Sequence, residues 1–336
     1  MSPRRGAPAS AMAVTVALVT VYILWGSTYL GIRFAEESIP ALLMGCLRFL
    51  VAGGLMIGWG LLRRPRGEPL PTIAQWRSTA IVGVALLGCG NGGVIWAEQH
   101  VPSGIAAIVV ATVPLHMAWL DRVFFRQAAS RWTMLGIGAG FAGLVVLVQP
   151  SGGNHIDIAG VLVMVVGSFC WAAGSLYART APMPRTMAMS SGMEMLAGGV
   201  VLGLAGVIAG EVGRVHPAAI SGKSLAAVAY LVVFGSIVGF SAYAWLIRNA
   251  RTSLVSTYAY VNPVVAVLLG ALFAAEAITL RTVIAGAIIL SGVALIVARP
   301  AAPRGLSAAA AASAEPGTPV PETVGASVGS REEAAV

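Results

Sequence analysis

Long apolar runs dominate this chain, and short polar stretches separate them. A helix needs about 20 apolar residues to cross a bilayer. Ten runs approach or exceed this length, and they span residues 12–34, 40–62, 78–97, 103–124, 132–149, 158–178, 186–209, 225–247, 253–275 and 280–298. A transmembrane barrel would instead show alternating segments of about ten residues, which the sequence lacks. The pattern predicts an all-α, polytopic membrane protein with ten transmembrane helices.

The composition supports the same class. Hydrophobic residues make up 57% of the chain and charged residues only 10%, and the mean hydropathy is +0.85. In an ordinary soluble domain about a quarter of the residues are charged. This composition therefore excludes an ordinary soluble domain.

The net charge of +8 follows the predicted topology. If the N-terminus is cytoplasmic, most arginines fall on the cytoplasmic side, among them Arg4, Arg63, Arg122 and Arg251. This positive-inside pattern predicts a multi-pass protein of the cytoplasmic membrane with both termini in the cytoplasm. Membrane lipid is thus an expected partner. Nucleic acid is not, because no basic stripe is interleaved with stacking aromatic residues.

The two ends of the chain differ from its apolar centre. Residues 1–11 are predicted to form a cytoplasmic segment before an uncleaved first helix, because the first apolar run is longer than that of a signal peptide. Residues 299–336 are rich in Ala, Pro, Ser and Glu and are predicted to form a disordered cytoplasmic tail. The cysteines, Cys46, Cys89 and Cys170, lie in predicted spans without metal-binding spacing. We predict no metal and no other cofactor.

The central part of the chain repeats itself. A displacement of 149 residues aligns the third to fifth helices of the two halves, and a slightly different displacement aligns the first helices. The matched pairs include Gly90 with Gly239, Trp96 with Trp245, Pro114 with Pro263, Phe124 with Phe273, and Trp25 with Trp171. The two units, residues 12–149 and 158–298, each hold five predicted helices. Because five is odd, the second unit enters the membrane from the opposite side, an inverted repeat typical of secondary transporters. A plain gene duplication without mechanistic meaning is the alternative.

Three stretches, "YILWGSTYLGIRFA…IPALLMGCLRFLVAGG", "VPSGIAAIVVATVPL" and "YAYVNPVVAVLLGALFAAEAIT", resemble EamA-type members of the drug/metabolite transporter superfamily. The resemblance covers about residues 12–298. It implies ten helices, transport of a small metabolite or drug, usually export, and a central cavity lined mainly by helices one, three, four, six, eight and nine. A Gly-Glu pair is frequent at the end of the family's fourth and ninth helices. Here Glu276 fits that position in the second unit, whereas Gln127 occupies it in the first.

Pro114 and Pro263 lie near the middle of the fourth and ninth runs. Each removes a backbone donor and disturbs the preceding helical turn. Breaks at matching positions of two repeats indicate a transport site near the midplane of the membrane. The alternative is a kink that only improves packing.

Polar and aromatic side chains recur at helical spacing around these prolines. Such spacing places side chains on one helix face, and we expect the faces to converge on a cavity for a small organic substrate. An aromatic packing seam is the alternative. The predicted substrate-binding residues are Tyr22, Trp25, Tyr29, Asn91, Thr112, Pro114, His116, Trp119, Trp171, Ser241, Tyr258, Asn262 and Pro263.

Three ionisable residues lie well inside predicted spans. Such residues are costly in lipid and often functional. His116 and Glu194 are candidates for proton coupling, although His116 could instead be a neutral ring bonded to Thr112 or to a carbonyl. Arg48 is expected to be a structural charge that anchors a helix by bonding carbonyl groups.

The sequence favours a secondary transporter, an exporter of a small organic metabolite or drug that works by alternating access of the inverted units. An importer or passive facilitator is the alternative. A membrane-embedded enzyme is disfavoured because no catalytic motif occurs, and we predict no catalytic residue. An energised pump would need a partner subunit, since the chain lacks a P-loop. The "GIGAG" stretch at Gly136–Gly140 suggests close helix packing, with a homodimer through the fifth and tenth helices as a candidate assembly.

Overall fold

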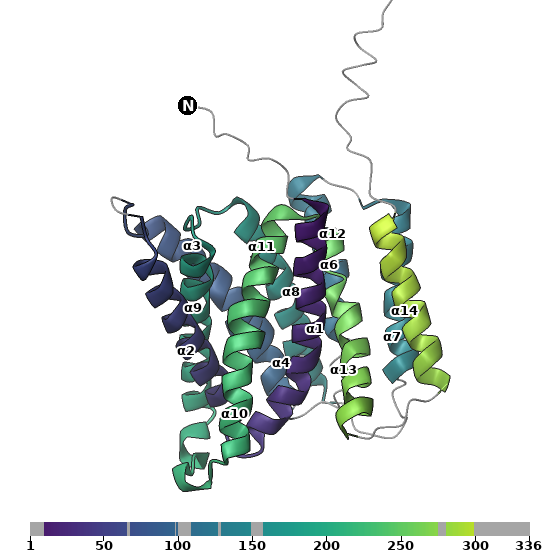
Figure 1. Ribbon diagram of the computed structural model, residues 1–336. Coiled ribbons are helices and arrows are strands. Elements are labelled where there is room, and N and C mark those ends of the chain that lie inside the picture. The colour runs from purple at the N-terminus through teal and green to yellow at the C-terminus, as the bar shows by residue number, and fades with distance from the viewer. Residues whose placement is uncertain are drawn as a thin grey trace, which may run out of the picture. The chain divides into compact units, whose positions relative to one another are not determined.

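The computed structural model describes residues 10–65, 68–97, 99, 109–126, 129–148, 157–274 and 280–298. Several sequence predictions lie outside these ranges: most of the N-terminal segment (1–11), the start of the fourth run, Gln127, Glu276 and the tail at 299–336. All regular elements within the described ranges are helices, with no strand among them (Figure 1). The all-helical prediction is confirmed for this part of the chain.

The first half of the chain contains α1 (Ala11–Glu36), α2 (Ala41–Leu62), α3 (Ile73–Gly83), η1 (Val84–Asn91), α4 (Gly92–Ala97), α6 (Val113–Phe125) and α7 (Arg131–Val148). The second half contains α8 (Ile158–Thr180), α9 (Met187–Ile208), the short 3₁₀ helices η2 (Glu211–Arg214) and η3 (Pro217–Ala219), α10 (Gly222–Tyr230), η4 (Leu231–Phe240), α11 (Ser241–Asn249), α12 (Thr252–Val255), α13 (Tyr258–Ala274) and α14 (Leu280–Ala298).

Short polar side chains start many of these helices. Ser10, Asp157, Thr186 and Ser221 each accept a hydrogen bond from a backbone N–H in the first turn of the helix that follows. Thr72 forms a capping box with Gln75 at the start of α3. These caps satisfy N–H groups that have no partner inside the helix. They fix where each apolar run begins.

The segments η1 and η4 are π-helical, and each continues directly into the α-helices on both sides. They occupy equivalent positions in the two units, because a displacement of 149 residues moves most of η1 onto η4. π-Helical turns are rare in proteins, and those that occur are often found at functional sites. Their recurrence in both halves therefore marks the third helix of each unit.

The structure corrects the expected pair of proline breaks. In the first unit the helix is interrupted by a turn at Ala111–Thr112, and Pro114 lies in the first turn of α6. In the second unit the turn lies at Ser256–Thr257, and α13 continues through Pro263. Proline is well suited to a first helical turn, where its missing N–H needs no partner. The matched prolines therefore do not mark matched breaks.

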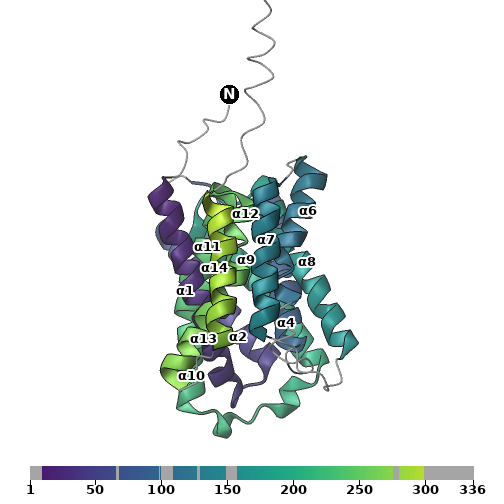
Figure 2. The same cartoon turned by 90° about the vertical axis from the view of Figure 1, so that its right-hand side faces the viewer.

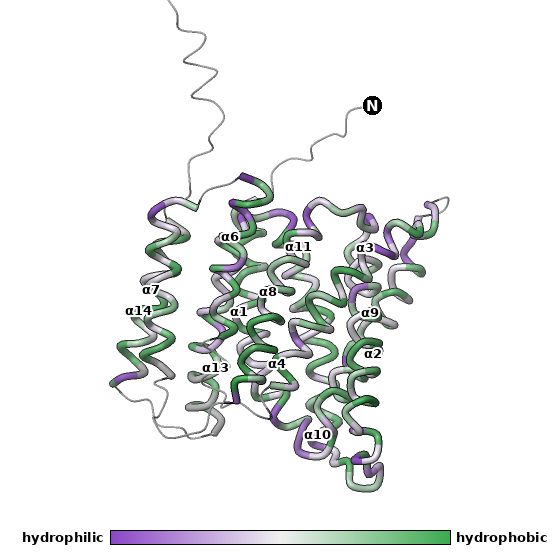
Figure 3. Tube along the Cα trace, turned by 180° about the vertical axis from the view of Figure 1, so that it is seen from behind, coloured by the Kyte–Doolittle hydropathy of each residue, from purple (hydrophilic) through white to green (hydrophobic). Residues whose placement is uncertain are grey.

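Six helical segments are long and apolar enough to cross a membrane by length and composition, within the described ranges. They are Ala11–Glu36, Ala41–Leu62, Ile73–Ala97, Ile158–Thr180, Met187–Ile208 and Gly222–Asn249. Hydrophobic residues follow much of the helices' length, and hydrophilic residues gather mainly near their ends (Figure 3). The start of α1 and the end of α14 lie at the same end of the set of helices, and we call this the terminal end (Figure 1).

The principal helix contacts join the two halves of the chain. The helix α2 packs on α9 (Figure 1), and α7 packs on α14 (Figure 2). Further contacts include two matched sets: α1 against η4 and α13 in one, and α8 against η1 and α6 in the other. Exchanging each helix for its counterpart in the other unit converts one set into the other.

The glycines of "GIGAG" are largely used inside the chain. A Cβ on Gly136 would lie 2.6 Å from the carbonyl oxygen of Gly292 on α14, and one on Gly140 would lie 2.9 Å from the ring of Tyr260. Gly138, in contrast, faces open space. Packing of α7 on α14 and on α13 within one chain therefore accounts for Gly136 and Gly140, and a homodimer through the fifth and tenth helices stays a prediction.

Candidate functional site

A cavity of about 120 Å³ lies between the two units. Residues from α1, α2, η1, α4 and α6 of the first unit and from α8, η4 and α13 of the second unit line it. On α1 the lining residues are Trp25, Thr28, Tyr29 and Ile32, all in the half of the helix farther from the terminal end. The cavity thus lies away from the end where α1 begins.

The structure brings six of the predicted substrate-binding residues together at this cavity. They are Trp25, Tyr29, Asn91, Trp171, Tyr258 and Asn262. Three pairs of lining residues occupy equivalent positions of the repeat: Trp25 with Trp171, Asn91 with Phe240, and Val113 with Asn262. Matched positions of both units therefore line the cavity, with the same side chain in one pair and different side chains in the other two.

Four of the remaining predictions share a helix with lining residues but do not line the cavity. Tyr22 is hydrogen-bonded to the hydroxyl of Thr257. Ser241 contacts the sulfur of Met56, at 3.7 Å, and Pro114 and Pro263 are also absent from the lining. These four residues do not line the cavity in this conformation, and their part in substrate binding stays a prediction.

The face formed by Thr112, His116 and Trp119 also lies outside the cavity lining. The Thr112 hydroxyl donates to the carbonyl of Val109, at 2.6 Å. The rings of His116 and Trp119 both pack on Phe169 of α8, with centroid distances of 5.8 and 6.3 Å. Val110 and Val113 line the cavity in their place, because the turn at 111–112 lies between them and separates the helix faces.

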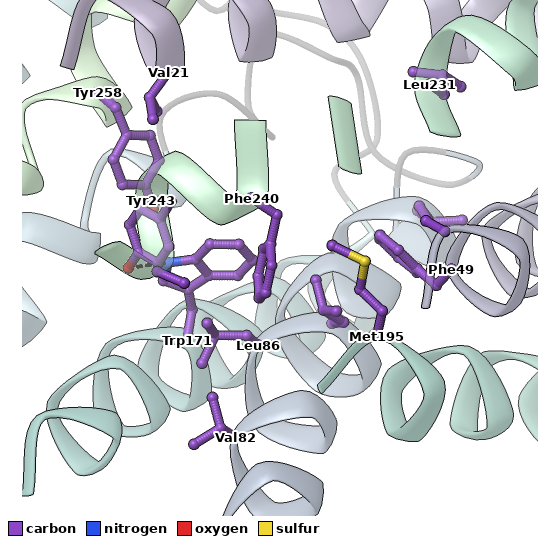
Figure 4. Close-up of a cluster of buried hydrophobic side chains, with 14 of the residues drawn as sticks. Val21, Phe49, Val82, Leu86, Trp171, Met195, Leu231, Phe240, Tyr243 and Tyr258 are labelled. Atoms are coloured by element: carbon purple, nitrogen blue, oxygen red, sulfur yellow. Dashed lines mark hydrogen bonds between the residues drawn. The ribbon is translucent and has the colours of Figure 1, made fainter. Parts of the chain in front are cut away.

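Four aromatic rings pack together beside the cavity. The Trp25 and Trp171 centroids lie 5.7 Å apart in an edge-to-face arrangement, and the rings of Tyr243 and Tyr258 contact both. The indole N–H of Trp171 donates to the Tyr243 hydroxyl at 2.9 Å (Figure 4). That hydroxyl is also hydrogen-bonded to Ser175, at 2.6 Å. The buried polar atoms of this cluster are thus satisfied, which fixes the ring positions.

Two glycines place these tryptophans. A Cβ on Gly90 would lie 2.9 Å from the Trp171 ring, and one on Gly239 would lie 2.7 Å from Trp25 Nε1. Gly90 lies in η1 and Gly239 in η4, at positions matched by the repeat. Each tryptophan therefore packs against the π-helical segment of the other unit. This explains why both glycines recur in the sequence pattern.

The charged residue at the cavity is Arg48. Its side chain is 5% exposed, and Nε donates to the hydroxyl of Ser236 at 2.8 Å. Its guanidinium group lies over the ring of Phe49, 4.9 Å from the centroid. Arg48 was predicted to bond carbonyl groups; the hydrogen bond that the structure gives it goes to a hydroxyl.

Glu194 lies outside the cavity lining and is paired. Its Oε1 accepts from Ser190 at 2.9 Å and lies 3.5 Å from Nη2 of Arg248, which also donates to Ser190 at 2.6 Å. The whole Glu194 residue is 1% exposed. This buried triad joins α9 to α11. Proton coupling through Glu194 stays a prediction, and the triad offers a structural role.

A second polar cluster lies nearer the terminal end. Nη1 of Arg179, at the end of α8, lies 3.5 Å from Oδ1 of Asp121 on α6 and 2.5 Å from the hydroxyl of Thr252 on α12. These contacts tie the first unit to the second. The Tyr22–Thr257 hydrogen bond does the same one layer closer to the cavity. Both sets of contacts lie between the cavity and the terminal end.

The sequence reasoning missed three polar residues at or beside the cavity, Tyr243, Thr28 and Ser168. Tyr243 was passed over for Ser241, although an intramembrane tyrosine on the eighth helix was itself a signal for a satisfied polar group near the cavity. Thr28 and Ser168 carry weaker signals, because small hydroxyl residues also serve plain helix packing. No group of three metal-ligating side chains occurs in the part of the chain that the structure describes.

Comparisons with known proteins give the family. The sequence profile of the EamA-like transporter family matches residues 12–149 and again residues 158–298. The "Uncharacterized inner membrane transporter YedA" of Escherichia coli K12 is 47% identical over 257 residues, covering 76% of this chain and 80% of that protein. A "Probable terminal-alkyne amino-acid exporter" of Streptantibioticus cattleyicolor is 26% identical over 83% of this chain and 92% of its own length. A "Probable amino-acid metabolite efflux pump" of Salmonella typhimurium is 23% identical over 81% of this chain and 90% of its own length.

A solved crystal structure shares the fold, with a TM-score of 0.70 and 21% identity over 85% of this chain and 96% of the other. Two matches to one family profile, and a close relative named as an inner membrane transporter, agree with the apolar helices and the central cavity. The chain is a multi-pass membrane transporter and belongs to the EamA-like transporter family of the drug/metabolite transporter superfamily.

Proposed function

We propose that this protein is a secondary transporter that exports a small organic molecule across the cytoplasmic membrane. In this proposal ten helices cross the membrane as two inverted five-helix units, 12–149 and 158–298, with both termini in the cytoplasm. The units rock against each other and expose the cavity to each side in turn. No catalytic residue and no cofactor takes part.

One observation carries the proposal: the cavity lies where equivalent positions of the two units meet. Trp25 and Trp171 face each other there, and each packs on the matched glycine of the opposite unit. The exchange pattern of helix contacts supports the same two-fold relation. When two units are related by such a two-fold exchange, swapping their conformations gives a second arrangement of the same kind. One arrangement is then open to one side of the membrane and the other to the opposite side.

The differences between matched positions support alternation. Tyr243 and Tyr258 fill the space beside the tryptophans in the second unit. The same displacement of 149 residues leads from them to Val94 and Val109 in the first unit, and Val94 lines the cavity. The two units thus present side chains of different size beside the tryptophans, and Val94 and Tyr258 both line the cavity. The Asp121–Arg179–Thr252 cluster would separate when the terminal end opens.

The direction of transport is supported by the names of two relatives, an amino-acid exporter and an amino-acid metabolite efflux pump. Import or passive facilitation of a small metabolite is the competing function. Metabolite levels in cells and medium distinguish them. An exporter raises its substrate in the medium of overexpressing cells and lowers it inside, compared with a deletion strain, whereas an importer does the reverse.

Flux through proteoliposomes tests transport itself. Vesicles that contain the protein and are loaded with a mixture of small metabolites, without ATP, should release some of the metabolites faster than loaded vesicles without the protein. Mass spectrometry measures the release. Chemical conversion of a metabolite without release would favour an enzyme instead.

A cross-link tests alternating access. Asp121→Cys and Thr252→Cys both replace side chains that contact Arg179. In a background in which Cys46, Cys89 and Cys170 are alanine, oxidation of this pair should lower the flux at least tenfold, and reduction should restore it. The two single-cysteine variants are the controls. Full flux in the oxidised double variant would contradict alternating access at this end.

A further inference from the structure

Arg48 differs from the arginine and lysine residues that form ion pairs in the structure. Ion pairs between described residues include Arg179–Asp121, Lys223–Glu37 and Arg248–Glu194. Arg48 is more buried than any of these cations, yet no carboxylate in the described ranges pairs with it. Its partners in the described structure are neutral: the hydroxyl of Ser236 and the ring of Phe49.

A buried cation without an anion is costly. Insertion of an arginine at the centre of a membrane helix costs about 2.5–3.5 kcal/mol, and buried charges are normally paired. Arg48 lines the cavity. The balancing charge can therefore come from whatever occupies the cavity.

The fold leaves room for the guanidinium group. A Cβ on Gly235 would lie 2.8 Å from Nη2 of Arg48, so a larger residue at this position in η4 would displace the side chain. Ser236, the next residue, holds Nε. One edge of the guanidinium fork is thus fixed by η4, and Arg48 belongs to a built site that joins the two units.

Two further polar groups of the lining have no partner among the described residues. The amide oxygens of Asn91 and Asn262 are buried and accept no hydrogen bond. They are suited to N–H or O–H donors of a ligand. The rings of Trp25 and Trp171 supply an apolar wall next to them. A ligand that satisfies all of these groups carries an anionic group, a hydrogen-bond donor and an apolar or aromatic body.

We propose that the cavity binds a small organic anion and that Arg48 pairs with its anionic group. The proposal rests on the transport function in naming its substrate class, but binding can be measured without transport. A cationic drug would be repelled by Arg48, and a neutral solute would leave its charge unbalanced. Carboxylate and phosphate groups both match the guanidinium fork.

The test compares four probes that share one aromatic body: 3-phenylpropanoate, 3-phenylpropyl phosphate, 3-phenylpropanamide and 3-phenylpropylamine. Binding to the purified full-length protein in detergent is followed by tryptophan fluorescence and by the shift in melting temperature. We expect at least one of the two anions to bind at least tenfold more tightly than the amide and the amine. The anion that binds better identifies the headgroup.

The variants assign this preference to Arg48. Arg48→Met should remove the preference for anions, Arg48→Lys should keep part of it, and Ser236→Ala should weaken it about threefold while the charge remains. Arg214→Gln, a change outside the cavity lining, is the control for general electrostatic attraction and should leave the preference unchanged.

Two results would overturn the proposal. One is binding of the amide or amine as tight as that of both anions. The other is an undiminished anion preference in a folded Arg48→Met protein. Anion binding that depends on Arg48, together with absence of flux in proteoliposomes, would instead contradict the transport function and leave the binding site standing.

Discussion

Two arginines on membrane helices, Arg48 and Arg248, have opposite surroundings. Arg248 lies beside the buried carboxylate of Glu194 and shares Ser190 with it, away from the cavity. Arg48 is 5% exposed, lines the cavity and has a hydroxyl and an aromatic ring as its partners. The comparison teaches that a charge neutralised within the chain serves packing, whereas a charge left without a counter-ion at a cavity is available to a ligand.

The repeat makes this contrast sharper. Arg48 lies on α2 and Glu194 on α9, which are the second helices of the two units and pack against each other. The alignment of Ala52–Gly54 with Ala197–Gly199 places Met193, not a charge, opposite Arg48. The two units therefore differ in the charged residues of their second helices, although these two helices pack against each other. One unit supplies the free cation, and the other supplies a neutralised pair.

The largest expected effect comes from breaking the neutralised pair. Arg248→Met leaves Glu194 buried without its cation and should lower the free energy of unfolding by about 3 kcal/mol. The melting temperature of the detergent-purified protein measures this loss. Adding Glu194→Gln should recover most of it, since the uncompensated charge is then gone. A stable single variant would show that Glu194 needs no counter-ion.

A smaller effect is expected at the cavity wall. Asn262→Leu removes an amide whose oxygen has no partner within the described structure, so folding should be little affected. Binding of a ligand with an N–H or O–H donor should weaken about tenfold, the equivalent of one hydrogen bond in a buried site. Titration by tryptophan fluorescence measures it. Equal affinities in the variant and the wild type would remove Asn262 from the ligand contacts.

Glu194→Gln asks whether the paired carboxylate also couples protons. Because Glu194 is bonded to Ser190 and Arg248 and does not line the cavity, we expect the pH profile of transport to keep its shape. Flux at several external pH values, at matched protein amounts, provides the comparison. A flattened profile would favour the coupling role predicted from the sequence.

The smallest effect is expected for His116. Its Nδ1 is buried without a partner in the described part of the chain, as are the oxygens of Asn91 and Asn262, but it packs on Phe169 outside the cavity lining. His116→Ala should change anion binding less than twofold. A large loss of anion binding would mean that a polar group without a hydrogen-bond partner contributes to binding even when it lies outside the cavity lining.

The sequence predicted the parts of the site that the repeat encodes. Trp25 and Trp171 were identified by their matched positions, and the structure brings them into contact. Helical spacing predicts that His116 and Trp119 share a face, but not where that face points after the turn at 111–112, and both rings pack on Phe169 outside the cavity lining. The partner of Arg48 could not be predicted either, since Ser236 is 188 residues away and only packing of α2 on η4 brings it near.

The most direct test of the central claim compares the melting temperatures of the wild type and Arg48→Met, each with and without the organic anion that binds best. Without ligand, the variant should be at least as stable as the wild type, because an uncompensated buried charge has been removed. With ligand, the wild type should gain stability and the variant should gain none. A variant that loses stability without ligand, as Arg248→Met should, and still gains stability from the anion would contradict the account.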